Sequence, residues 1–192
     1  MSLPDIISEK IRQTGPISFR DFMEIALYYP GLGYYTSPED RIGRPGDYYT
    51  NPNLSQAFGE MLGAQLEEMW HLLGENEFTV VEMGAGTGLL SGDVYGYLKE
   101  RVGDFNYCIV EKSPALQDKQ RKHLGDDIGW YDSLEEIGDI EGCIFSNELV
   151  DAFPVHLVQM GKELMEVFVD YDGRFFEILR PASYELKNYM AE

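Results

Sequence analysis

The sequence is poor in basic residues, poor in cysteine and free of long apolar runs. Its 192 residues include 15 Lys and Arg against 34 Asp and Glu, so the formal net charge is −19. Recognition of a phosphate backbone needs an extended basic face, and this composition excludes one. The same charge disfavours binding to anionic membrane surfaces. We therefore expect no nucleic acid partner.

No apolar run approaches the roughly 18 residues that span a bilayer. The beginning of the sequence lacks the basic region typical of a signal or transit peptide. Cys108 and Cys143 each stand inside a short apolar run, which is typical of buried thiols in a reducing compartment. We expect no membrane insertion. The expected location is the bacterial cytoplasm, or the mitochondrial matrix for a mature eukaryotic relative.

The histidines are also too few and too scattered to indicate metal chemistry. His71, His123 and His156 have no metal-ligand spacing with Cys, His or carboxylate partners. No Gly-x-Ser-x-Gly segment and no Cys/His pairing indicates a covalent nucleophile. The sequence therefore predicts no metal site.

The pattern of residues changes twice along the chain. Residues 1–77 predict helices and loops, whereas residues 78–154 alternate buried strands with helices, which favours a mostly parallel α/β sheet that binds the ligand. Residues 155–192 predict an antiparallel β-meander with a hairpin turn at Asp172-Gly173. The expected strands are 78–83, 106–111, 128–131, 143–146, 155–160, 163–170 and 174–179, and the expected helices of the sheet region are 89–100 and 114–124.

Two helices are expected in the N-terminal region. Ser18 followed by Asp21 resembles a capping box at the start of the first helix. A second, longer helix carries Ser55, Gly59 and Gly63 four residues apart, which predicts close packing against another element.

The most informative segment, Glu82-Met-Gly-Ala-Gly-Thr-Gly-Leu89, stands between a predicted strand and a predicted helix. Glycines there let the backbone turn sharply and approach a ligand. A dinucleotide fingerprint would need glycine at position 89, and a P-loop would need Gly-Lys-Ser/Thr. The spacing suits S-adenosylmethionine better, because Glu82 can serve its ammonium group directly or through water. A glycine-rich turn without a ligand is the alternative. The expected cofactor-binding residues of this loop are Glu82, Gly84, Ala85, Gly86 and Gly88.

Acidic residues end the next two predicted strands. Glu111 follows the second strand, where an acid in a nucleotide-binding fold accepts both ribose hydroxyls. Trp130, Tyr131 and Asp132 end the third strand, where adenine would lie. We predict that Glu111 and Asp132 bind the cofactor, although a solvated turn and a helix cap are alternatives for these two acids.

A further polar group follows the fourth predicted strand, at the edge of the sheet where ligands bind. Methyl transfer is a direct displacement, so the protein must align the nucleophile and support its charge. Carboxylates such as Glu148 and Asp151 could clamp a guanidinium group and take its proton. We predict catalytic roles for Asn147, Glu148 and Asp151, with a capped helical turn and solvated acids as the alternative.

The acidic residues are concentrated before this motif. Between Asp126 and Asp151 the chain has nine acidic residues and no Lys or Arg. A solvated acidic face explains most of this pattern. An acidic mouth would also attract a cationic substrate segment, and the substrate KM should then rise with added salt.

Five segments together form a recognisable pattern. They are Phe22-Met23 through Tyr35, Gly46 to Pro52, Ser55 to Glu60, Glu82 to Gly88 and Asn147 to Val155. This pattern resembles the MidA-like family of class I S-adenosylmethionine-dependent methyltransferases, the group that contains a mitochondrial complex I assembly factor. The glycine loop is common to all class I methyltransferases. The segments at Gly46 and Asn147 are more particular to this family.

The resemblance implies a Rossmann-like methyltransferase sheet, S-adenosylmethionine as cofactor and a protein arginine as acceptor. It further implies a role in respiratory complex I assembly and places Gly46 and Thr50 near the cofactor. Family members are considerably longer, so the chain is expected to be an N-terminal portion with an incomplete sheet. The expected partner is a protein with a cationic segment, such as a complex I subunit, and homodimer formation is left open.

Two other functions remain open from the sequence. The first is a non-catalytic module that binds S-adenosylmethionine or a partner protein. The second is a nicotinamide-dependent oxidoreductase, which Leu89 disfavours.

Overall fold

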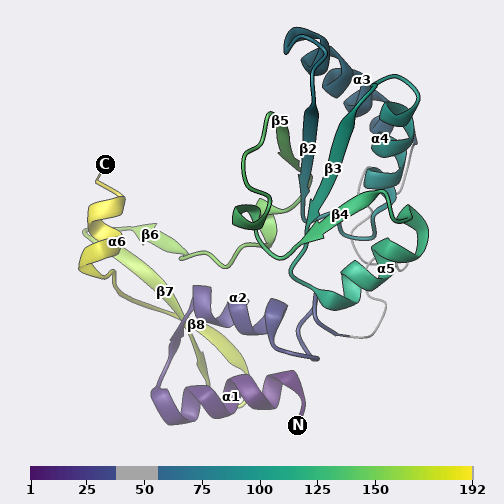
Figure 1. Ribbon diagram of the computed structural model, residues 1–192. Helices are drawn as coiled ribbons and strands as arrows, with labels where there is room; N and C mark the ends of the chain where they lie inside the picture. Colours follow the sequence, from purple (N-terminus) through teal and green to yellow (C-terminus); the bar gives the residue numbers. More distant parts are fainter. Residues whose placement is uncertain (38–55, 192) are drawn as a thin grey trace. The chain divides into compact units, whose positions relative to one another are not determined.

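The computed structural model describes residues 1–37 and 56–191 (Figure 1). The chain divides into two compact units, which we describe separately. Residues 39–149 form the sheet unit, and residues 1–38 together with 150–192 form the meander unit. Within the described residues, no helix is both long and apolar enough to cross a membrane.

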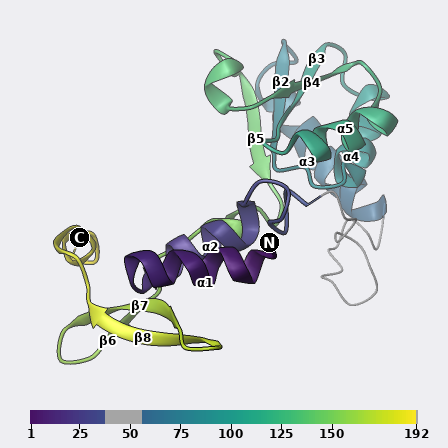
Figure 2. The same ribbon diagram turned by 90° about the horizontal axis from the view of Figure 1, so that it is seen from below.

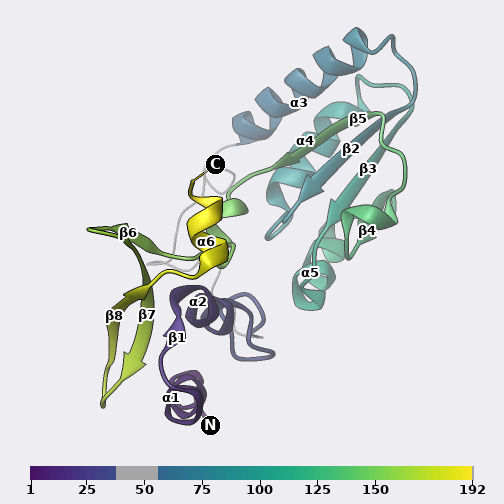
Figure 3. The same ribbon diagram turned by 90° about the vertical axis from the view of Figure 1, so that its left-hand side faces the viewer.

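The sheet unit is built on parallel strands. Among its described residues these are β2 (Phe78–Met83), β3 (Phe105–Val110), β4 (Ile128–Tyr131) and β5 (Gly142–Ser146), in the order β4-β3-β2-β5 (Figure 3). In the register, Val81 of β2 lies opposite Cys108 of β3 and Ile144 of β5. The parallel α/β sheet predicted from the alternation of strands and helices is therefore confirmed.

One face of this sheet is covered by helices. These are α3 (Gln56–Leu72), α4 (Leu89–Lys99) and α5 (Pro114–Leu124), which lie together on one side of the strands in Figure 1. Every second residue of β2 points toward the helices. Phe78 and Val80 do so, and they share a hydrophobic core with Leu66 of α3 and Val94 of α4. Successive strand residues face opposite sides, so Val81 points to the other face and packs near η2 (Leu134–Glu136).

The glycines of α3 allow the close helix packing that their spacing predicts. A Cβ atom on Gly59 would collide with Asp93 of α4, and one on Gly63 would lie 2.7 Å from Tyr97 Cδ1. The two helices can approach this closely only because neither position carries a side chain.

The meander unit is organised around its longest strand, β7 (Leu164–Tyr171). β7 pairs antiparallel with β6 (Val158–Met160), β8 (Phe175–Pro181) and β1 (Ile17–Ser18). The expected antiparallel meander is confirmed. The chain continues beyond β8 into α6 (Tyr184–Tyr189), and η3 (Val150–Ala152) precedes β6.

Two N-terminal helices complete the meander unit. α1 (Leu3–Thr14) and α2 (Phe19–Tyr28) lie against the strands, as Figure 2 shows. Ile7 and Ile11 of α1 share a core with Ile17 and Val169. At the start of α2, the Asp21 backbone N–H donates to Ser18 Oγ at 3.1 Å, which confirms the serine half of the predicted capping box, whereas the Asp21 carboxylate accepts from Arg20.

This division differs from the three consecutive regions that the sequence predicts, 1–77, 78–154 and 155–192. α1 and α2 join the C-terminal strands, whereas α3 joins the parallel sheet. The physical reason is the long-range pairing of Ile17 with Val169, which local periodicity does not contain. The unit boundary falls between Leu149 and Val150, inside the Asn147 motif.

Candidate functional site

The order of the parallel strands identifies one edge of the sheet as a ligand site. The chain runs from β2 through α4 to β3 and through α5 to β4, and then returns to the other side of β2 as β5. The strand order therefore reverses between β2 and β5, and open α/β sheets bind ligands at such a switch point. The segments after these two strands meet there, since a Cβ atom on Gly84 would lie 2.6 Å from Leu149 Cδ1.

The glycine loop lies at this switch point, between β2 and α4. Gly84, Gly86 and Gly88 have φ angles of 71°, 57° and 82°, the left-handed region that favours glycine. Gly88 is the N-cap residue of α4 and provides no side-chain cap. Ala85, by contrast, is buried in the hydrophobic core. The expected setting of strand, tight loop and helix is confirmed.

Glu82 does not face the loop surface. It shares the side of β2 occupied by Phe78 and Val80, so its carboxylate lies beneath α4 with only 2 % of the residue exposed. Its Oε2 accepts hydrogen bonds from Ser91 Oγ at 2.6 Å and from Tyr107 Oη at 2.7 Å. Burial raises the pKa of Glu82, and these two bonds oppose the rise. In this structure Glu82 connects β2 with α4 and β3, and its expected role toward an ammonium group, directly or through water, stays a prediction.

Glu111 directly follows β3 and is 9 % exposed. Its Oε1 accepts a hydrogen bond from the Ser113 backbone N–H at 2.9 Å, and its own N–H donates to the Tyr131 carbonyl at 3.0 Å. Burial raises the pKa of Glu111, while hydrogen bonds from Ser113 and from the Gln120 side chain lower it to a smaller extent. The carboxylate is thus held in place beside the end of β3.

Asp132 follows β4 and is exposed. Its Oδ1 accepts a hydrogen bond from Gln117 Nε2 at 3.1 Å, and its backbone N–H donates to Glu136 Oε2 at 3.3 Å. The same Gln117 amide donates to the Glu111 carbonyl at 2.6 Å. The ends of β3 and β4, with both predicted acids, are therefore joined through one side chain of α5.

Gln117 and Gln120 are the residues that the sequence analysis missed. Both lie on α5, and Gln120 is completely buried. Gln120 Nε2 donates to the Gly86 carbonyl at 3.0 Å, and its Oε1 accepts from Trp130 Nε1 at 3.0 Å. Glutamine in a polar helix is ordinarily a surface residue, so only the three-residue spacing indicated a shared face.

The predicted catalytic residues occupy the segment after β5. Asn147 is half-buried, and Glu148 is exposed with a φ angle of 51°. A residue other than glycine in the left-handed region is uncommon and typical of functional segments. Asp151 is exposed in η3 and belongs to the meander unit, whereas Glu148 belongs to the sheet unit. Joint action of the two carboxylates stays a prediction.

Two other predicted cofactor residues, Gly46 and Thr50, lie outside the described residues. Cys108 is buried and Cys143 is half-buried, and burial raises the pKa of both thiols. Among residues 1–37 and 56–191, no group of three or more His, Cys, Asp or Glu side chains is arranged to hold a metal ion.

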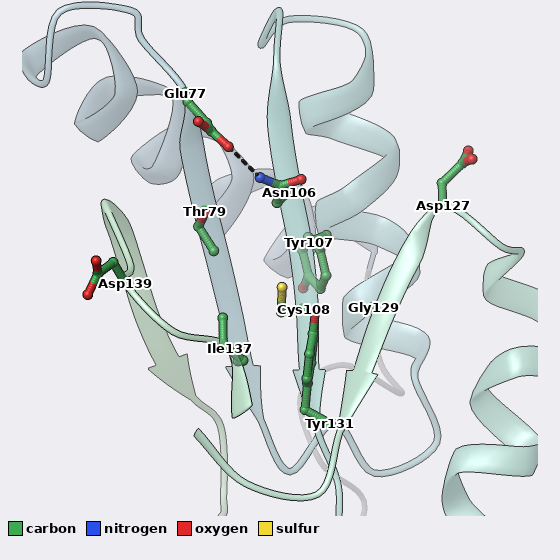
Figure 4. Close-up of a pocket in the computed structure, with 10 residues that line it drawn as sticks. All are labelled: Glu77, Thr79, Asn106, Tyr107, Cys108, Asp127, Gly129, Tyr131, Ile137 and Asp139. Carbon is green, nitrogen blue, oxygen red and sulfur yellow. Dashed lines mark hydrogen bonds between the residues drawn. The ribbon is translucent and has the colours of Figure 1, made fainter. Parts of the chain in front are cut away.

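A hollow of about 380 Å³ lies on the sheet face opposite α3 and α4 (Figure 4). Its lining includes the carboxylates of Glu77, Asp127 and Asp139, but two of these are already engaged. Glu77 accepts from Asn106 Nδ2 at 3.1 Å, and Asp127 pairs with Lys99 Nζ at 3.0 Å. None of the residues predicted to bind the cofactor lines this hollow. It is therefore separate from the switch-point site.

Known proteins resemble the chain over most of its length. Residues 61–192 match the model of a family described as "Putative S-adenosyl-L-methionine-dependent methyltransferase". The mitochondrial protein arginine methyltransferase NDUFAF7 of Danio rerio is 34 % identical over 86 % of this chain and 46 % of its own length. Its Homo sapiens counterpart is 31 % identical over 89 % of this chain and 45 % of its own length. The chain thus spans about half the length of the curated relatives it matches.

Two crystal structures of Burkholderia thailandensis proteins share the fold. One, bound to S-adenosyl-homocysteine, has a TM-score of 0.84 and 32 % identity, covering 98 % of this chain and 52 % of the other. A native structure has a TM-score of 0.81 and 29 % identity, covering 98 % of this chain and 50 % of the other. The matched family model covers well over half of the present sequence. The chain belongs to this family of S-adenosyl-L-methionine-dependent methyltransferases.

Proposed function

We propose that this protein binds S-adenosylmethionine at the switch point of its sheet and takes part in methylating a protein side chain, with arginine as the acceptor. The glycine loop between β2 and α4 carries the proposal, because its three glycines take left-handed φ angles that turn the strand sharply into the helix, and the space beside Gly86 is open. The related Burkholderia structure that holds S-adenosyl-homocysteine supports the same cofactor.

The bound cofactor would supply an electrophilic methyl group on a sulfonium. In this proposal Glu111 accepts the ribose hydroxyls, because its carboxylate lies at the end of β3 and its position is fixed by the Ser113 backbone. Asp132, tied to the same helix, lies near the adenine. Gly84 and Gly86 present the backbone of the loop to the cofactor, and Ala85 and Gly88 hold its shape from buried positions. Glu82 supports the loop through its hydrogen bonds with Ser91 and Tyr107.

Glu148, Asp151 and Asn147 are proposed to act on the acceptor. A guanidinium group is cationic and a poor nucleophile, so carboxylates that localise its charge and take its proton would assist displacement. As the acceptor nitrogen bonds to the methyl carbon, the carbon–sulfur bond breaks and the nitrogen loses one proton. Both carboxylates are exposed, which leaves them accessible to a protein substrate.

The names of the relatives support an arginine acceptor and a mitochondrial location for eukaryotic members. A role in complex I assembly, with a cationic segment of a complex I subunit as substrate, is the finer form of this proposal. The Burkholderia neighbours show that bacteria contain proteins of this fold, and a cytoplasmic location for a bacterial form is part of the proposal.

A non-catalytic module that binds S-adenosylmethionine is the second candidate. One observation favours it: the carboxylates proposed to act on the acceptor, Glu148 and Asp151, belong to different units, whereas the glycine loop and Glu111 belong to one. The two candidates share the cofactor site and differ only in methyl transfer.

Calorimetric titration with S-adenosyl-homocysteine and with NAD tests the cofactor. We expect heat of binding with the first ligand and none with the second. Binding of NAD alone would contradict the proposal.

Transfer of a labelled methyl group to an arginine peptide then separates the two candidates, with the same peptide carrying lysine in place of arginine as the control. Transfer to arginine supports the enzyme, whereas binding without transfer supports the module. If transfer occurs, an acceptor KM that rises with salt would support an acidic docking surface.

A further inference from the structure

Two glutamines of α5 connect three segments proposed to surround the cofactor, namely the glycine loop, the segment after β3 and the end of β4. Gln117 and Gln120 stand three residues apart, so they share one face of the helix. Gln120 has no exposed surface, although glutamine is mostly found on protein surfaces. A buried amide is tolerated only when its donors and acceptor have partners.

The partners of Gln120 lie on separate segments of the site. Its Nε2 donates to the carbonyl of Gly86 in the glycine loop, and its Oε1 accepts from the indole N–H of Trp130 on β4, both at 3.0 Å. A further hydrogen bond from this side chain lowers the pKa of Glu111 against the larger effect of burial. One side chain therefore contacts the segments that follow β2 and β3 and the end of β4.

Gln117 makes the corresponding connection nearer the helix start. Its Nε2 donates to the Glu111 carbonyl at 2.6 Å and to Asp132 Oδ1 at 3.1 Å. Backbone hydrogen bonds already join neighbouring segments, from Gly84 to Val110 and from Glu111 to Tyr131. The glutamines add the link that these bonds lack, because Gln120 joins the glycine loop directly to β4.

The indole is held on a second side as well. The Arg121 guanidinium lies over the Trp130 ring, 4.2 Å from the ring centroid. Trp130 is thus fixed at its edge by Gln120 and on one face by Arg121. Its orientation at the end of β4 depends on two consecutive residues of α5.

We propose that Gln117 and Gln120 are positioning residues for the cofactor, with Gln120 the more important. They set the spacing between the glycine loop, Glu111 and the end of β4, and so fix the adenosine half of the site before the ligand arrives. This inference rests on the proposed cofactor. A preorganised site binds more tightly because less ordering remains to be done on binding.

Gln120→Met tests the inference with little change in side-chain volume. It removes the hydrogen bonds while keeping a flexible chain of similar size. We expect the Kd for S-adenosyl-homocysteine to rise about tenfold or more. In the active protein, the KM for S-adenosylmethionine should rise while kcat changes little. Gln65→Met is the matched control, since Gln65 is exposed on α3 and bonds only to Glu68, and its Kd should stay within about twofold of the wild type.

A spectroscopic measurement on the unliganded protein separates this inference from the proposed function. In a Trp70→Phe background Trp130 is the remaining tryptophan, since the chain has two. Gln120→Met should shift its emission to longer wavelength, because the indole N–H must then bond to water. Amide hydrogen exchange at residues 84–88 should become faster, and Gln65→Met should change neither readout.

Gln117→Met provides a second test of the inference in case Gln120→Met does not fold. The partners of Gln117 are the Glu111 carbonyl and the Asp132 carboxylate, and the exposed carboxylate can accept from water instead, so we expect a smaller increase in Kd, of about threefold. Unchanged Kd, emission and exchange in Gln120→Met would overturn the inference. If the wild type binds no S-adenosyl-homocysteine, the cofactor proposal fails, while the emission and exchange measurements still decide whether α5 orders the loop.

Discussion

The two units bury polar side chains for different purposes. In the meander unit they serve local structure: Ser18 caps α2, and Ser8 Oγ donates to the Asp5 carbonyl one turn earlier. In the sheet unit they connect separate elements at one end of the strands, as Glu82 and Gln120 do. Each buried polar group has a desolvation cost. The gathering of such groups around the glycine loop is therefore consistent with a ligand-binding site there.

Glu166 is the exception in the meander unit. It is 5 % exposed, and its Oε1 lies 2.6 Å from Nδ1 of the half-exposed His156. This pair joins the segment before β6 to β7. It does not connect three or more segments in the way that Gln120 does, so the contrast between the two units holds.

Ile11→Ala should have the largest effect on stability and the smallest on the cofactor. Ile11 is 3 % exposed in the core of α1 and β7, and its truncation should cost about 3 kcal/mol of unfolding free energy. Urea denaturation measures this loss. The Kd for S-adenosyl-homocysteine should remain unchanged under conditions where the variant is folded. A Kd that rises together with the loss of stability would contradict a site confined to the sheet unit.

Glu82→Ala should destabilise the sheet unit by about 2 kcal/mol. The substitution leaves the hydroxyls of Ser91 and Tyr107 without their buried acceptor. Cofactor affinity should fall as well, because the carboxylate supports the strand that leads into the glycine loop. Glu82→Gln is the control, since its carbonyl oxygen has two lone pairs and can accept both bonds. Equal losses in both variants would show that charge, and not hydrogen bonding, is what β2 needs.

The same residue gives the wild type and Glu82→Gln different pH dependences of stability. Burial raises the pKa of Glu82, so the folded protein keeps this proton to higher pH than the unfolded chain does. Its contribution to stability therefore falls as the pH rises from the ordinary glutamate pKa to the raised one. Glu82→Gln should lose this slope in a denaturation series over that interval. A wild type and variant with parallel curves would show that Glu82 titrates normally.

Glu111→Gln should weaken S-adenosyl-homocysteine binding about tenfold, because one neutral amide replaces a charged acceptor of two hydroxyls. For the wild type, affinity should fall with decreasing pH, since protonation removes an acceptor and burial raises the pKa of Glu111 into a less acidic range. The variant should show no such decline. Calorimetry across the acidic range measures both curves. Parallel pH profiles would exclude Glu111 as the titrating group.

How far the sequence predicts this molecule differs between the two units. The parallel strands could be predicted because Phe78 to Met83 and its neighbours are short segments rich in apolar and β-branched residues, each followed by turn residues. In the sheet unit the strand starts shifted by one residue, at β3, which begins at Phe105 against a predicted 106, and at β5, which begins at Gly142 against 143. In the meander unit β6 begins at Val158, three residues after the predicted start at 155. The partnership of α1 and α2 with β7 could not be predicted, because it depends on contacts between residues far apart in the chain.

The candidate site shows the same limit at the level of single side chains. The glycine loop and Glu111 could be located because strand ends meet at one edge of a parallel sheet. The direction of the Glu82 carboxylate follows from strand alternation, yet the glycine motif suggested a role at the loop surface. Gln120 could not be predicted as a site residue. The burial of a polar helix residue depends on its neighbours in space and does not change the pattern of apolar residues along the helix.

The smallest expected change in stability is at Glu148, where two variants separate the effect of backbone strain from the role of the carboxylate in methyl transfer. Its φ of 51° places a side-chain-bearing residue in the left-handed region, which costs about 1 kcal/mol relative to glycine. Glu148→Gly should therefore stabilise the protein by up to about 1 kcal/mol, less the entropy that glycine loses on folding. Glu148→Gln keeps the strain and removes the charge. If the carboxylate acts on the acceptor, methyl transfer falls in both variants while the melting temperature rises in only one. Transfer that survives in Glu148→Gln would mean that the backbone conformation, and not the carboxylate, is what the site requires at this position.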